Sequence, residues 1–134
     1  MNKVIKDLPQ HLQEEEKQLR LHGINNWFLV KDLQDEKLLE IAKKSRATTR
    51  NLKRIRGMAT LICEINLSQS EASLLLHAGV PSVQALASLT PSELMNKTGR
   101  LERQLSTGRK PYVDIKKASN WTMNARRANS ELTQ

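Results

Sequence analysis

The stretch KKSRATTRNLKRIR, residues 43–56, is the part of the sequence best suited to a definite chemistry. It carries seven basic side chains in fourteen positions and no carboxylate. Lysine and arginine bind phosphates and carboxylates, so this stretch is suited to binding an anion. A helix face that only keeps a protein in solution usually pairs its lysines with glutamates at helical spacing. Because no glutamate interrupts this stretch, we expect an anionic partner to neutralise it.

A second group of basic side chains lies in the C-terminal half of the chain. Residues 97–127 carry nine basic and two acidic side chains, whereas residues 64–96 carry three acidic side chains and no basic one. The whole chain has a net charge of +8 and an isoelectric point near 9.9. The candidate residues for binding nucleic acid or another anionic partner are Lys43, Lys44, Arg46, Arg50, Lys53, Arg54, Arg56, Arg100, Arg103, Arg109, Lys110, Lys116 and Lys117.

The remaining reactive residue types form no recognisable catalytic or metal-binding pattern. His11, His22 and His77 are scattered, and none is spaced from another histidine, cysteine or carboxylate as metal ligands are. Cys63 is the single cysteine, so it can form neither an intrachain disulfide nor a cysteine-based metal site. The segment STGRKP lacks the glycine spacing of a phosphate-binding loop, and no GxSxG motif is present. We therefore expect no enzyme activity, no cofactor, no metal and no small-molecule substrate.

Aromatic side chains are scarce, which bears on how a nucleic acid could be bound. The chain contains two tryptophans, one tyrosine and one phenylalanine. Single-strand binders usually offer several exposed rings on which bases stack. We expect Trp27, Phe28 and Trp121 to be buried, so contact with the backbone of a duplex or structured nucleic acid is favoured over single-strand stacking.

The elements that must present these side chains are predicted to be helices. Apolar residues recur at spacings of three and four along most of the chain, and the alternating pattern of strands is missing. The length of 134 residues suits one medium domain or two very small ones. No window approaches the run of about 18 apolar residues that a membrane span needs, and no signal peptide is evident. We expect an all-α, cytoplasmic protein.

An internal repeat organises the predicted helices. The segment HGINNWFLVKDLQDEKL, residues 22–38, aligns without gaps with AGVPSVQALASLTPSEL, residues 78–94, at an offset of 56. Gly23 falls on Gly79, and a helix is predicted to end at each of them because glycine tolerates the left-handed conformation that closes a helix. The predicted organisation is a first unit over residues 1–63, a second unit over residues 64–128 and a flexible tail over residues 129–134.

Further signals set the limits of individual helices. The segments SQSE (68–71) and TPSE (90–93) both match a capping box, and Pro91 occupies the favoured first helical position. A long helix is predicted over residues 48–62 and a last helix over about residues 112–127. Their inward-facing residues are expected to be Leu52, Ile55, Ala59 and Ile62 in the long helix, and Ile115, Ala118, Thr122 and Ala125 in the last one.

The repeat resembles tandem helix-hairpin-helix units, a SAM-like arrangement of about six to eight helices. The phrases that carry this resemblance are the glycine-hydrophobic steps in LHGINN and LHAGVPSV and the following LASLTPSEL. The run from LICEINLSQSEASLLLHAGVPSV through PYVDIKKASNWTMNAR is similar to the domain of unknown function DUF4332, a helix-hairpin-helix-like family frequent in cyanobacteria. The resemblance covers residues 8–127.

The resemblance implies non-catalytic, sequence-independent binding of the nucleic-acid backbone, whether DNA or RNA. Helix-hairpin-helix proteins use backbone N–H groups of a glycine-containing hairpin, typically LPGIG, to hold phosphate. The corresponding stretches here are LPQHL (8–12) and INLSQ (65–69), which contain no glycine, so binding would depend on the basic helices. The alternative function is a protein-protein adaptor or assembly factor that docks on an acidic surface of a larger complex, such as a photosynthetic one. Peripheral contact with anionic lipid also fits.

Overall fold

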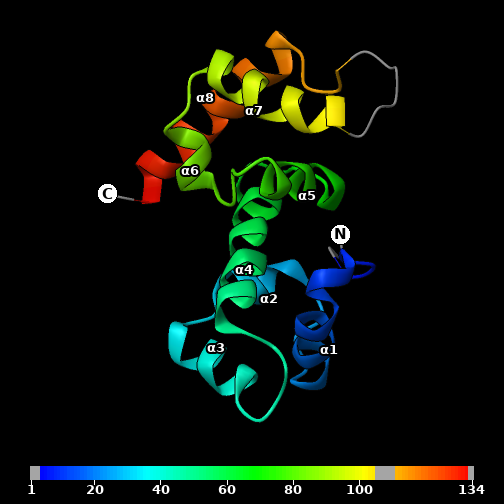
Figure 1. Cartoon of the computed structure of the whole chain (residues 1–134). Coiled ribbons are helices and arrows are strands. Elements are labelled where there is room, and N and C mark those ends of the chain that lie inside the picture. Colours follow the sequence, from blue (N-terminus) through cyan, green and yellow to red (C-terminus); the bar gives the residue numbers. More distant parts are fainter. Residues whose placement is uncertain (1–3, 105–110, 133–134) are drawn as a thin grey trace. The chain divides into compact units, whose positions relative to one another are not determined.

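The computed structural model describes residues 4–104 and 111–132, which form eight α-helices and one short 3-10 helix (Figure 1). Within these residues there is no strand, only an isolated bridge between Val4 and Asn26. The prediction of an all-α chain is therefore confirmed. The chain divides into two compact units, Met1–Ala59 and Thr60–Gln134. The division after residue 63, read from the sequence repeat, stays a prediction.

The first unit is built from short helices and the beginning of a long one. The 3-10 helix η1 (Gln10–Leu12) leads into α1 (Gln13–Leu21), which is followed by α2 (Trp27–Lys31), α3 (Asp35–Ala42) and α4 (Thr49–Glu64). Large side chains fill the core of this unit, and aliphatic residues dominate it. The buried residues are Ile5, Leu8, Leu12, Leu19, Ile24, Trp27, Val30, Leu38, Ile41, Ala47, Leu52, Ile55, Met58 and Ala59.

Among the described residues, the second unit is also built from four helices, the first two of which have the same lengths as α1 and α2. It contains α5 (Gln69–His77), α6 (Val83–Ala87), α7 (Pro91–Gln104) and α8 (Ile115–Leu132), and α8 packs against both α6 and α7. Its buried residues are Leu61, Ile62, Leu67, Ala72, Leu75, Val80, Val83, Leu86, Leu94, Thr98, Val113, Ala118, Trp121, Thr122 and Ala125. The inward stripes predicted for α4 and for most of α8 are therefore confirmed.

The helix starts reproduce the offset seen in the sequence. The first residues of α1, α2 and α3 each lie 56 positions before those of α5, α6 and α7 (13 and 69, 27 and 83, 35 and 91). The starts of α4 and α8, at residues 49 and 115, lie 66 positions apart. The ten additional positions fall after the start of α7, which is 14 residues long where α3 is 8.

A glycine in the left-handed conformation closes the first helix of each unit. Gly23 has a φ of 77°. The N–H of the next residue, Ile24, donates to the carbonyl of Leu19 at 2.8 Å, while the N–H of Gly23 donates to that of Arg20 at 3.0 Å. This pair of bonds is the Schellman motif, and it places the buried Ile24 over the last turn. The second unit forms the same bonds with Gly79 (φ 88°), Val80, Leu75 and Leu76.

Side-chain caps set the starts of the helices as predicted. In the box at the start of α5, Ser68 Oγ accepts from the N–H of Glu71 at 3.0 Å, and the Glu71 carboxylate accepts from the N–H of Ser68 at 2.9 Å. Thr90 and Glu93 form the equivalent pair at 3.1 and 2.9 Å, with Pro91 as the first residue of α7. Both predicted capping boxes are confirmed.

Two predictions about individual residues and one about the end of a helix were wrong. Phe28 is 46% exposed because α2 is a five-residue helix whose inner face is occupied by Trp27 and Val30, so the residues between them point outward. Ile115 is exposed because it is the first residue of α8, and the buried Val113 before it contributes to the core instead. The helix α8 continues to Leu132, beyond its predicted end at residue 127, since no proline or glycine follows that residue to stop it.

The same substitution at two glycines should have opposite effects on stability. We expect Gly79→Ala to lower the free energy of unfolding by about 1–2 kcal/mol, because an L side chain at positive φ is strained even where space is open. Gly99→Ala, within α7, should raise it by about 0.5–1 kcal/mol through a smaller loss of backbone entropy. Urea denaturation of both variants tests this, and equal effects would contradict the role given to Gly79.

Candidate anion-binding surface

The basic residues of the first unit lie on the connection between α3 and α4 and on the first turns of α4. Lys43 is the C-cap of α3, and Lys44 turns the chain with a left-handed φ of 62°. Arg46 follows in the connection, and Arg50 and Lys53 lie on α4. All five side chains are exposed, and we refer to these five residues as the basic cluster.

A buried glutamate on α1 holds the basic cluster in place. Glu15 is only 2% exposed, and one of its carboxylate oxygens accepts from the backbone N–H of Thr48 at 2.8 Å. The Thr48 hydroxyl in turn accepts from the N–H of Asn51 at 3.1 Å and caps α4. The Asn51 amide donates to the carbonyl of His11 at 3.4 Å. The start of α4, and with it the cluster, is thereby anchored to the start of α1.

No carboxylate among the described residues pairs with the basic cluster. The ion pairs in this part of the chain join Arg20 to Glu16, Lys37 to Glu40 and Arg56 to Asp35. Arg54, which was also predicted as a binding residue, donates to the side-chain oxygen of Asn51 at 3.3 Å and is half-buried. None of the five cluster cations therefore makes a direct ion pair within the described residues, although the charge of Lys53 also acts on Asp35.

Arg56 differs from the cluster because its guanidinium is bound within its own unit. Its Nη1 lies 2.8 Å from Asp35 Oδ1 and 3.0 Å from the carbonyl oxygen of Leu33, and its side chain is 25% exposed. The hydrogen bond and charge of Arg56, aided by the charge of Lys53, hold the pKa of Asp35 below its ordinary value. Arg56 thus ties the end of α2 to α4.

An arginine of the second unit, not singled out by the sequence, makes the equivalent contact. Arg126 on α8 donates to the carbonyl oxygen of Leu89 at 2.6 Å and to that of Ala87 at 3.3 Å. Leu89 lies 56 positions after Leu33, so both arginines bind the same carbonyl of the repeat. The two arginines lie 70 positions apart, which matches neither the offset of 56 nor that of 66, so sequence alignment could not have paired them.

The predicted binding residues of the second unit that the structure describes lie on α7 and at the start of α8. Arg100, Arg103 and Lys116 are exposed. Lys117 is half-buried, and its Nζ lies 3.5 Å from the centroid of the Tyr112 ring, a cation-π contact. The predicted binding residues Arg109 and Lys110 lie outside the described residues.

The two stretches compared above with a helix-hairpin-helix hairpin contain or follow a residue other than glycine in the left-handed conformation. Asn66, within INLSQ, adopts a left-handed φ of 59°, and Asp7, just before LPQHL, adopts one of 56°. A buried leucine follows each of them, Leu67 and Leu8 respectively. A side chain on such a turn keeps a phosphate from the close backbone approach that glycine allows.

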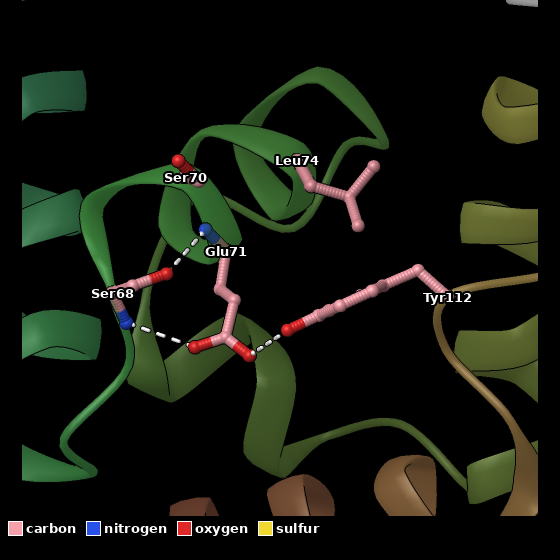
Figure 2. Close-up of a pocket in the computed structure, with 5 residues that line it drawn as sticks. All are labelled: Ser68, Ser70, Glu71, Leu74 and Tyr112. Atoms are coloured by element: carbon pink, nitrogen blue, oxygen red, sulfur yellow. Dashed lines mark hydrogen bonds between the residues drawn. The ribbon is translucent and has the colours of Figure 1, made fainter.

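A shallow pocket of about 270 Å³ lies between α5 and the segment before α8 (Figure 2). It is lined by Ser68, Ser70, Glu71, Leu74 and Tyr112. The Tyr112 hydroxyl donates to Glu71 Oε2 at 2.7 Å, and the other carboxylate oxygen of Glu71 accepts from the N–H of Ser68. Partial burial raises the pKa of Glu71, but these hydrogen bonds and the charge of Lys117 outweigh it, so the net pKa is lowered. Glu71 is therefore ionised at neutral pH.

Within the described residues, neither a metal site nor a membrane-spanning helix is found. No group of three or more histidine, cysteine, aspartate or glutamate side chains comes together in a way that could hold a metal ion. None of the helices in residues 4–104 and 111–132 is long and apolar enough to cross a membrane.

The stability contributed by Glu71 should depend on pH. A carboxylate whose pKa is lower in the folded protein contributes stability that is present above its ordinary pKa of 4.5 and lost as the pH falls through the lowered value. Glu71→Gln keeps the capping box, because glutamine also suits this position, but removes the ionisable group. We expect the difference in free energy of unfolding between the native chain and this variant to be largest at neutral pH and to shrink below about pH 4.5. A difference that does not change with pH would contradict the assignment.

Arg56 and Arg50 lie on the same helix, and we expect the same substitution at each to change the free energy of unfolding by different amounts. Arg56→Gln loses a charged hydrogen bond to the Leu33 carbonyl, which alone should lower the free energy of unfolding by about 1 kcal/mol. Arg50→Gln, at an exposed position without an ion pair among the described residues, should change it by less than about 0.5 kcal/mol. Urea denaturation measures both, and a larger loss in the Arg50 variant would overturn the distinction.

Comparison with known proteins gave one match. The family model of a domain of unknown function, DUF4332, matches residues 9–128. Neither the curated proteins nor the solved structures contain a match.

Proposed function

The chain belongs to the DUF4332 family of domains of unknown function, and from its own residues we propose that it binds the phosphate backbone of nucleic acid without catalysis and without reading sequence. The observation that carries this proposal is the basic cluster, whose five exposed cations have no carboxylate partner among the described residues. A nearby arginine of the same helix, Arg56, does have one.

The contrast between paired and unpaired cations supports an external anion. An exposed cation gains little from a surface ion pair, but several cations held close together repel one another unless an anion neutralises them. Glu15 fixes the loop that holds Lys43, Lys44 and Arg46 against the start of α4, so the cluster is held together despite this repulsion. Duplex DNA, with one charge per about 1.7 Å of its axis, is a partner of the required charge density.

The segment that carries the cluster favours nucleic acid over an acidic protein. Protein interfaces normally contain a buried centre of aromatic or aliphatic anchors. The exposed residues between positions 43 and 54 are all polar, because the apolar residues there, Ala47 and Leu52, are buried in the core. A segment with charge and no apolar anchor of its own suits contacts with phosphate, which position a protein without reading bases.

Each unit is further proposed to be a degenerate helix-hairpin-helix element. The repeated Schellman turns at Gly23 and Gly79 and the matching helix starts support two copies of one design. Because neither hairpin carries glycine, we propose that side chains of α4, α7 and α8, and not the backbone of the hairpin, contact the phosphates. Arg100, Arg103 and Lys116 are the exposed residues of the second unit that would take part.

Salt dependence of binding tests the proposal. We expect the affinity for a duplex of arbitrary sequence to fall steeply with salt, and Arg50→Gln to reduce the slope of log K against log salt by about 0.9. Arg56→Gln removes the same charge from the same helix but should leave the slope nearly unchanged, because its guanidinium already binds Asp35 and Leu33. Fluorescence anisotropy with labelled duplexes of two unrelated sequences gives both slopes and the sequence dependence.

Capture from a lysate separates the two partner classes. A variant with Arg46, Arg50 and Lys53 changed to glutamate should lose the material bound by the native chain, and nuclease treatment should release that material. Capture of an acidic protein that survives nuclease and depends on the same three residues would replace this proposal with the adaptor function. Salt-insensitive binding to duplexes would also contradict it.

A further inference from the structure

The last helix of the chain, α8, has one buried side and one exposed side. The buried residues lie together on the side that faces the core of the second unit and are Ala118, Trp121, Thr122 and Ala125. The opposite side, which we call the outer face of α8, consists of the exposed residues Lys116, Ser119, Asn120, Met123, Arg127 and Ser130. The outer face is thus a continuous side of an 18-residue helix that is open to another molecule.

The basic residues of α8 differ in whether the fold already uses them. Lys117 makes a cation-π contact, and Arg126 donates to two backbone carbonyl oxygens. Lys116 and Arg127, both on the outer face, form no ion pair among the side chains that the structure describes. The sequence has no acidic residue from position 115 to position 130. The outer face is therefore complementary to a negatively charged partner.

The outer face has no continuous apolar patch. Among the described side chains of α8, the large exposed apolar ones are Ile115 and Met123. They are eight positions apart, which is about 12 Å along the helix axis, and the hydroxyl of Ser119 lies between them in the sequence. Interfaces between proteins usually have a buried centre of aromatic or aliphatic anchors. A cationic face without such a centre fits the charged surface of nucleic acid better than that of an acidic protein.

The spacing of the two outer cations matches the major groove of duplex DNA. Lys116 and Arg127 are eleven positions apart, about three helical turns, so both side chains leave the helix in nearly the same direction. The rise between them is about 16 Å. The major groove of B-form DNA is about 12 Å wide and the minor groove about 6 Å. A pair with this separation reaches the phosphates on both walls of the major groove, whereas it extends well beyond the walls of the minor groove.

The size of the helix also suits the major groove. An α-helix with its side chains is about 10–12 Å across, and the major groove of B-form DNA admits one. The side chains of Ser119 and Asn120, between the two cations, are short and leave room for the bases. The major groove of A-form RNA is deep and narrow, so side chains cannot enter it in the same way. The phosphates of both walls are present in every sequence, so contact through them does not require the reading of bases.

We propose that α8 lies in the major groove of B-form duplex DNA, with Lys116 and Arg127 on the phosphates of opposite walls. The inference rests on the proposed function and deepens it, because it names the form of the nucleic acid and the groove. Met123, in the middle of the outer face, then points toward the floor of the groove.

Filling the major groove tests this placement. Fluorescence anisotropy compares a labelled DNA duplex with a duplex of the same sequence in which every cytosine carries a glucosylated hydroxymethyl group at C5, a position that opens into the major groove. We expect the modified duplex to bind at least about fivefold more weakly, and an RNA duplex of the same sequence to bind more weakly by a similar factor. A small molecule that fills the minor groove should leave the affinity unchanged.

Two pairs of variants locate the effect on the outer face. Met123→Glu should weaken binding to the unmodified duplex about tenfold, because it places a negative charge between the two walls of phosphate. Gln84→Glu adds the same charge at an exposed position of α6 and should change the affinity less than about twofold. Arg127→Gln should reduce the slope of log K against log salt by about 0.9, whereas Arg126→Gln should change it little, because Arg126 already binds the carbonyl of Leu89. Circular dichroism shows whether each variant is folded.

The outcomes separate this inference from the proposed function. If the modified and unmodified DNA duplexes bind equally tightly and the affinity falls steeply with salt, backbone binding stands and the placement of α8 in the major groove is refuted. Equal affinities of the folded Met123→Glu and Gln84→Glu variants would refute it as well, and so would an RNA duplex that binds as tightly as DNA. If no duplex binds at all, the proposed function itself fails.

Discussion

A single buried carboxylate on α1 constrains where the chain passes between α3 and α4 in the first unit. Glu15 accepts the N–H of Thr48, the residue that caps α4, and this contact spans 33 positions of sequence. A buried carboxylate is costly unless it is hydrogen-bonded, so the bond restricts where the chain can pass between α3 and α4. The bond therefore ties the end of the loop that carries Lys43, Lys44 and Arg46 to α1.

The equivalent glutamate of the second unit has a different environment. Glu71 lies 56 positions after Glu15, also in the first turn of its helix, but it is partly exposed and is bonded to the hydroxyl of Tyr112. In the first unit the carboxylate is covered by the chain and serves as an anchor. In the second it borders an open pocket, where it can meet another molecule. The same position of the repeat thus anchors the loop of the basic cluster in one copy and borders a pocket in the other.

Some arginines of each unit are bound within the fold, whereas other cations are exposed. Arg56 and Arg126 both bind the carbonyl of a leucine two residues past the short second helix of their unit, although they come from positions that do not align. A guanidinium, which has five N–H donors and no acceptor, is a suitable partner for this oxygen. Cations not required for this task, such as Arg50 and Lys53, are left with their charge exposed.

Local features were predictable from the sequence, because local interactions decide them. The helix ends at Gly23 and Gly79 follow from the conformational freedom of glycine, and the capping boxes at Ser68 and Thr90 follow from hydrogen bonds between residues three positions apart. The all-α class and the repeat offset of 56 follow from periodicity. The cationic character of residues 43–56 was evident from composition alone.

Tertiary packing decided which charged and aromatic residues are available to another molecule. The sequence could not reveal that Arg56 is bound to Asp35 while Arg50 is not, because the two arginines differ only in which face of α4 meets the loop after α2. The sequence predicted that Phe28 is buried, but in the fold it is exposed. The sequence did not indicate an environment for Tyr112, which the fold places in hydrogen-bond contact with Glu71, 41 positions earlier. Hydrophobic spacing and capping fix each helix locally, but long-range contacts fix the environment of each side chain, and that environment determines its chemistry.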